Sequence, residues 1–137
     1  MTRRVKQIAM YAGVVGLLGA GTAFWVSVVS PLLLGPRYQA TFDSIRADDG
    51  IDQQEAGAMA SLYFWTYVGA SGAPDEPKLI DGVWIAPLRI GVAGESSGGV
   101  LRIDPRSGAV SSSSGRTFGS YGSFRRSVAW RLSWRNP

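Results

Sequence analysis

The chain contains neither cysteine nor histidine. Without cysteine it can form no disulfide and carry no lipoprotein anchor, so its fold must rest on packing. Together the two absences exclude thiol nucleophiles, the usual zinc sites, axial haem ligands and histidine-based acid–base catalysis. We therefore expect a protein that acts by binding, with no enzymatic activity, catalytic residue, cofactor or metal site.

Acidic side chains are missing from both ends of the chain. The first seven residues carry three basic side chains, and residues 106–137 carry six arginines. All ten acidic residues lie between positions 36 and 105, where the net charge is −5. Two basic ends around an acidic middle are not typical of a DNA-binding domain. We therefore expect no nucleic-acid partner.

One uncharged run of 27 residues extends from Ile8 to Leu34. A bilayer core of about 30 Å needs about 20 apolar residues in a helix, so the run predicts a transmembrane helix. The basic residues before it predict a cytoplasmic N-terminus, because positive residues beside a span tend to stay inside. The alternative is a cleavable signal peptide, with Gly21 and Ala23 as the small residues before the cut.

The chain is thus divided into a cytoplasmic basic arm (1–7), a transmembrane helix (8–34) and an extracytoplasmic domain (36–137). The predicted location is the inner membrane of a bacterium, with the domain in the periplasm. Disulfides are absent even though this compartment permits them.

Small residues recur along the predicted membrane helix at spacings of mostly three and four. Such small-xxx-small patterns let two helix backbones approach closely, although glycine is also simply common in membrane helices. We expect this stripe to pack against a second helix, from another subunit or from another copy of the chain. Its members are Ala9, Ala12, Gly13, Gly16, Gly19, Ala20 and Ala23.

The domain is predicted to be α+β, with two helices packed on an antiparallel sheet. A short helix is expected at residues 37–47 and a longer one at 52–68. Asp52 and Glu55 have the spacing of a capping box at the start of the longer helix, and Gly69 is expected to end it.

Strand patterns dominate the second half of the domain. Residues 82–92 and 99–104 predict a hairpin. Pro87 indicates a bulge or an edge position, because proline cannot donate to the ladder. Residues 127–135 alternate strictly between apolar and polar side chains, which predicts a half-buried third strand.

Two polar segments are predicted to be loops. Residues 69–77 include the adjacent acids Asp75 and Glu76, which we expect to be solvated rather than catalytic. Residues 111–115 contain four serines, and no base is available to activate one of them.

Two groups of side chains predict a surface for a protein partner or for lipid. One is the aromatic end of the helix at 52–68, and the other is the arginine-rich last segment. Arginine beside aromatic rings suits anionic headgroups or an acidic partner, and tryptophan and tyrosine favour the membrane interface. The residues are Tyr63, Phe64, Trp65, Tyr67, Arg125, Arg126, Arg131 and Arg135.

Three segments, at 51–69, 81–84 (DGVW) and 98–110 (GGVLRIDPRSGAV), resemble small bacterial NTF2-fold and PepSY-like modules. Many of these modules are immunity proteins or binding domains without catalysis. A weaker similarity connects the G-P-x-Y segment at 35–38 and the W-x-L of residues 130–132 with oxidase-assembly proteins of the Coa1/Tim21 type. There a membrane helix leads into a small α+β domain that ends in a W-x-L strand.

The sequence therefore predicts a single-pass, non-enzymatic binding protein, an accessory or assembly subunit of an inner-membrane complex. The alternative is a membrane-tethered immunity protein that neutralises a periplasmic toxin. The expected partners are the membrane, a protein (a membrane complex or a toxin) and another copy of the chain through the membrane helix.

Overall fold

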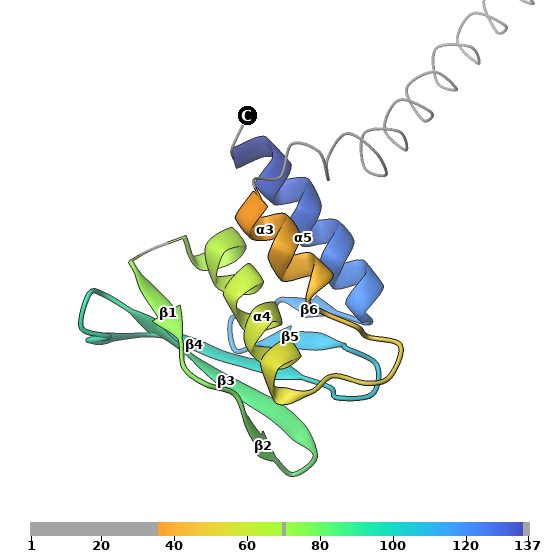
Figure 1. The fold of residues 1–137 in the computed structure, drawn as a ribbon. Coiled ribbons are helices and arrows are strands. Elements are labelled where there is room, and N and C mark those ends of the chain that lie inside the picture. Colours follow the sequence, from red (N-terminus) through yellow and green to blue (C-terminus); the bar gives the residue numbers. More distant parts are fainter. Residues whose placement is uncertain (1–35, 70, 136–137) are drawn as a thin grey trace, which may run out of the picture.

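The computed structural model describes residues 36–69 and 71–135. The predicted membrane helix and its stripe of small residues lie outside these ranges. The described residues form an α+β domain in which helices cover one face of a six-stranded antiparallel sheet (Figure 1). Within these ranges, no helix combines the length and the apolar character needed to cross a bilayer.

The first helix, α3 (Pro36–Asp43), is shorter than the predicted helix at 37–47. Proline is favoured at a first helical position because its missing N–H would have no helical partner there. The predicted apolar face is present, with Phe42 and Ile45 both buried. Ile45 lies just beyond the helix, in a turn that its backbone N–H closes on the carbonyl of Phe42.

The predicted helix at 52–68 is confirmed, and it consists of two parts. The α-helix α4 (Gln53–Tyr63) continues directly into a π-helical turn, η2 (Phe64–Val68). Gly69 ends the segment in the left-handed conformation, with φ of 63°. Its backbone N–H bonds to the Phe64 carbonyl five residues earlier, as the wider π-turn requires.

The predicted capping box is also confirmed. Asp52 accepts from the backbone N–H of Glu55, and Glu55 Oε2 accepts from that of Asp52. The second carboxylate oxygen, Oε1, accepts from the backbone N–H of Arg46 at 2.7 Å. Glu55 is only 8% exposed, so this one carboxylate joins the α3–α4 connection to the start of α4.

The sheet has the order β1-β3-β4-β5-β6, and the short strand β2 pairs with the same edge of β3 as β1 does. The strands are β1 (Gly72–Pro74), β2 (Lys78–Ile80), β3 (Val83–Ile90), β4 (Ser96–Ile103), β5 (Val110–Ser112) and β6 (Thr117–Phe118). The predicted hairpin is confirmed as β3 and β4. Within it, the register shifts between Pro87 and Arg89, which is the bulge that proline indicated.

The prediction of a strand at 127–135 is wrong, because these residues belong to a helix, α5 (Tyr121–Arg135). Val128 and Leu132 belong to the alternating pattern, but they also continue a series with a spacing of four that begins at Phe124. All three are buried, and a spacing of four defines one helix face. The W-x-L of residues 130–132 is therefore helical, unlike the strand that its resemblance to assembly proteins implied.

A start signal for α5 lies just before it. Ser120 Oγ accepts from the backbone N–H of Ser123, and Ser123 Oγ accepts from that of Ser120. This is the reciprocal pattern of a capping box, with serine at the position where Glu or Gln is usual.

The helices α3 and α5 run antiparallel. The Arg125 guanidinium lies over the Phe42 ring, 5.7 Å from its centre, and the charge of Asp43, at the end of α3, acts on Tyr121, at the start of α5. The end of α5 therefore lies beside the start of α3, as Figure 1 also shows. Between helices and sheet, the core includes Phe64, Phe124 and Leu101.

Replacing Glu55 with alanine should lower the free energy of unfolding by about 2 kcal/mol, because two partly buried backbone N–H groups lose a charged acceptor. Thermal unfolding of the full chain, followed by near-ultraviolet circular dichroism, measures the effect. Glu76→Ala is the control, since Glu76 is exposed and accepts one bond from Gln53. Equal losses in the two variants would contradict the role given to Glu55.

Replacing Tyr121 with phenylalanine should stabilise the fold by about 1 kcal/mol, because the buried Tyr121 hydroxyl finds no hydrogen-bond partner within the described residues. Burial raises the pKa of Tyr121; Glu55 and Asp43 raise it further, and Arg125 lowers it. The neutral ring is thus favoured in the folded state. Its contribution is complete below pH ~10, where an unfolded tyrosine titrates, and is lost as the pH rises further.

Unfolding measured at neutral and alkaline pH tests both statements. The phenylalanine variant should lose less stability than the natural chain between pH 9 and about 11. A variant that is less stable at neutral pH and equally sensitive to alkali would contradict this account of Tyr121.

Candidate functional site

Two arginines from separate parts of the chain contact the ring of one half-buried tyrosine, Tyr67. The guanidinium carbon of Arg116 lies 4.4 Å from the centre of the Tyr67 ring, and that of Arg131 lies 4.8 Å from it. The two guanidinium groups are therefore within about 10 Å of each other. We call Tyr67, Arg116 and Arg131 the tyrosine–arginine cluster.

Three elements build this cluster. Tyr67 is on η2, Arg131 is on α5 and Arg116 lies in the connection between β5 and β6. The Tyr67 hydroxyl forms a hydrogen bond with Ser127 Oγ, one turn before Arg131. The Tyr67 ring also packs against Phe118, 5.8 Å between ring centres, which brings β6 to the same place.

The π-helical turn presents Tyr67 to these partners. Thr66, its buried neighbour, donates to the Leu62 carbonyl at 2.6 Å and so keeps its hydroxyl inside the helix. The Tyr67 ring also contacts the ring of Tyr63, one helical turn earlier, with 5.0 Å between ring centres.

Hydroxyl groups border the cluster, whereas carboxylates are missing from it. Ser112 and Ser114 form a hydrogen bond of 2.7 Å, and the Tyr63 hydroxyl lies 3.5 Å from Ser114 Oγ. In the described part of the chain, the one ion pair joins Arg89 and Asp75, at 2.9 Å. Both cluster arginines are exposed and keep their charge available for an anion from outside.

The predicted aromatic surface is only half present. Tyr63 and Phe64 are buried, at 3% and 1% exposure, so the prediction that they form a partner surface is wrong. Four aromatic residues within five positions cannot share one helix face, and the core takes these two. Trp65 and Tyr67 are half-buried. The Trp65 and Tyr38 rings meet edge to face, with 5.4 Å between their centres and 63° between their planes.

The predicted arginines separate into different environments. Arg131 reaches the Tyr67 ring, whereas Arg125 lies over Phe42 on α3. The Arg126 guanidinium lies near Gly122, close to the start of α5. Arg135 ends the helix, and its side chain lies outside the described part.

Sequence reasoning missed Arg116, because it follows a serine-rich segment that was predicted to be a loop. That segment contains β5, and two bonds close its hairpin with β6: the Ser112 backbone N–H donates to the Arg116 carbonyl, and the Arg116 backbone N–H donates to Ser112 Oγ. A signal for β5 was available in Val110, which follows the Pro-x-x-Gly turn at 105–108 by two residues and is buried in the sheet.

The cluster lies at the end of the domain where α3 begins. Tyr38 follows Pro36 by two residues, and its contact with Trp65 places η2 beside the start of α3. Because α5 is antiparallel to α3, its last turns lie at this end too (Figure 1). Trp130, 37% exposed, is next to Arg131 in this part of α5.

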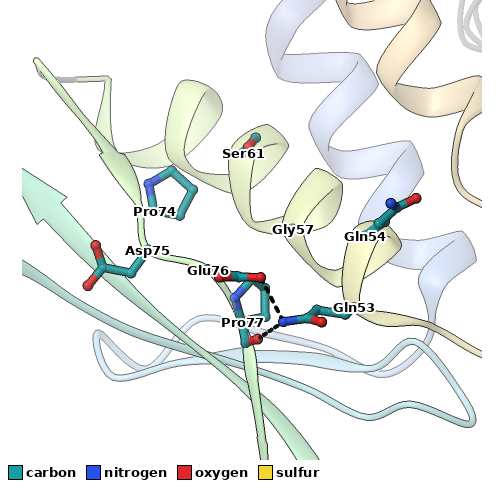
Figure 2. A pocket seen from close by; sticks show the side chains of 8 residues that line it. All are labelled: Gln53, Gln54, Gly57, Ser61, Pro74, Asp75, Glu76 and Pro77. Carbon is teal, nitrogen blue, oxygen red and sulfur yellow. Dashed lines mark hydrogen bonds between the residues drawn. The ribbon is translucent and has the colours of Figure 1, made fainter.

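A separate cavity of about 430 Å³ lies between α4 and the β1–β2 connection (Figure 2). Gln53 Nε2 donates at 3.0 Å both to Glu76 and to the Pro77 carbonyl across its floor. The predicted paired acids are thus separately engaged, Glu76 with Gln53 and Asp75 with Arg89. The cavity contains one hydroxyl, of Ser61, and its amides and carboxylates do not form a nucleophile–base pair.

Two broader observations bear on function. In residues 36–69 and 71–135, no three acidic side chains gather closely enough to hold a metal ion. No protein-family model matches the chain, and neither curated proteins nor solved structures give a significant match.

The stacking of Arg131 on Tyr67 should appear as a coupling free energy of about 0.5–1 kcal/mol, the usual size for an exposed cation–π contact. A double-mutant cycle with Tyr67→Leu and Arg131→Gln measures it through thermal unfolding. The control cycle pairs Tyr67→Leu with Arg126→Gln and should be additive within about 0.5 kcal/mol. Additivity in both cycles would show that Arg131 does not depend on the ring.

Proposed function

We propose that this chain is a non-enzymatic, membrane-anchored binding protein, an accessory or assembly subunit of a bacterial inner-membrane complex. The predicted membrane helix leads directly into α3, at the end of the domain that carries the tyrosine–arginine cluster. The observation that carries the proposal is the position of the cluster near the start of α3, where the uncharged run of the sequence ends.

Other features of the chain support binding over catalysis. The chain has no cysteine or histidine. Its adjacent acids bond to different partners, Asp75 to Arg89 and Glu76 to Gln53. The exposed groups of the cluster are the two arginine cations, which bind anions without needing a reaction.

The membrane helix supplies the second contact in this proposal. Its stripe of small residues, from Ala9 to Ala23, would pack against a helix of the complex or of a second copy. The N-terminus would then be cytoplasmic and the α+β domain periplasmic.

Crosslinking in intact cells, followed by purification in mild detergent and mass spectrometry, tests the proposal. We expect a stoichiometric set of membrane subunits to copurify with the natural chain. Gly16→Ile should remove them, because a β-branched side chain would separate the packed backbones. Leu18→Ile, on the opposite side of the predicted helix, should leave them in place.

Other outcomes overturn particular parts of the proposal. Recovery of a single secreted protein, with no membrane subunit, would replace the accessory role with that of an immunity protein. Full recovery of the subunits with Gly16→Ile would exclude the small-residue stripe as the contact.

A further inference from the structure

We propose that the tyrosine–arginine cluster binds the phosphate of anionic lipid headgroups and so holds the domain against the membrane. The inference rests on the proposed membrane anchorage and names lipid as the partner of one surface. It concerns the domain end at which Pro36 begins α3.

The arrangement of the two arginines fits a phosphate group. Arginine binds phosphate oxygens through two parallel N–H donors, which makes it more selective for this geometry than lysine. The guanidinium carbons of Arg116 and Arg131 lie 4.4 Å and 4.8 Å from the centre of the same Tyr67 ring, and both side chains are exposed, so one phosphate headgroup can contact both from outside. The ring holds both guanidinium groups beside it, and both arginines remain exposed.

The local charge favours an anion in this position. No acidic residue follows Asp104 in the chain. The charged side chains of α5 and of the β5–β6 hairpin are therefore all positive. An anion between the two arginines also relieves their mutual repulsion.

The position of the cluster in the domain favours a bilayer as the source of that anion. The cluster is linked to the start of α3 through Trp65 and Tyr38, and residues 8–34 precede that start with no charged side chain. A surface so close to an anchor lies within reach of headgroups, where each basic residue is attracted to anionic lipid. Exposed Trp130, beside Arg131, is a residue type that favours the same interface.

The opposite end of the domain provides an internal control. Gln53, at the start of α4, bonds to the Pro77 carbonyl just before β2, whereas the far end of the α4–η2 segment carries Tyr67. About 14 helical residues at 1.5 Å each separate the two ends by roughly 20 Å. Leu79 on β2 is 56% exposed and therefore can carry a probe there.

The experiment uses the full chain reconstituted in vesicles. Because the chain has no cysteine, Ser114→Cys or Leu79→Cys gives one site for an environment-sensitive fluorophore. Cofloating with pure phosphatidylcholine vesicles checks the anchor first. We then expect the probe at 114, and not at 79, to shift to the blue when phosphatidylglycerol is included.

The arginines are tested by charge-matched variants. Arg116→Gln with Arg131→Gln should reduce the ratio of docked to undocked domain about 30-fold, since each arginine near an anionic surface contributes about a fivefold preference. Arg102→Gln with Arg106→Gln removes the same charge from exposed positions outside the cluster and should change the ratio far less. High salt should reverse the shift in the natural chain.

Each contrary result overturns a definite statement. A chain that fails to cofloat with neutral vesicles is not anchored, and both the proposed function and this inference fail. If it cofloats but position 114 does not respond to phosphatidylglycerol, or position 79 responds instead, only the lipid contact fails. Reversal by excess soluble glycerol phosphate at constant ionic strength would assign the cluster to a free phosphate compound.

Discussion

The arrangement of this domain depends on burial of the apolar side of α5. Phe124, Val128 and Leu132 enter the core at a spacing of four, which fixes both the helical conformation and the rotation of α5. With that rotation set, Ser127 and Arg131 meet the ring of Tyr67. The same packing makes α5 antiparallel to α3. The last turns of α5, which include Arg131, therefore lie beside the start of α3. Core formation thus positions the surface proposed for binding.

Local signals in the sequence were sufficient for the elements that are stabilised locally. The reciprocal Asp52–Glu55 bonds define one helix start, and Pro87 marks the bulge in β3. The short strand β2 pairs with β3 across a two-residue turn at residues 81 and 82, both with positive φ. Asp-Gly is a strong hairpin signal, so this strand could have been predicted. The strand β1 could not, because its three residues are extended only through pairing with β3.

The conformation of α5 and the composition of the site were harder to predict, since they depend on contacts distant in sequence. Alternation from Ser127 to Arg135 fits a strand over nine residues, and only inclusion of Phe124 reveals the helix. Tyr67 and Arg131 were both predicted as surface residues, but their contact joins positions 64 residues apart. Arg116 was missed because nothing in a serine-rich segment indicates which ring its single arginine will reach.

The direction of α5 can be measured directly by electron–electron double resonance with pairs of spin labels on introduced cysteines. One label is placed at Asp43, at the end of α3, and the other at Gly122 or Arg131, near the two ends of α5. Antiparallel packing predicts that the 43–131 distance exceeds the 43–122 distance by about 7 Å, because nine helical residues rise about 13 Å beside a helix about 9 Å away. Equal distances, or a shorter 43–131 distance, would remove the arginine-bearing end of α5 from the start of α3 and contradict the account.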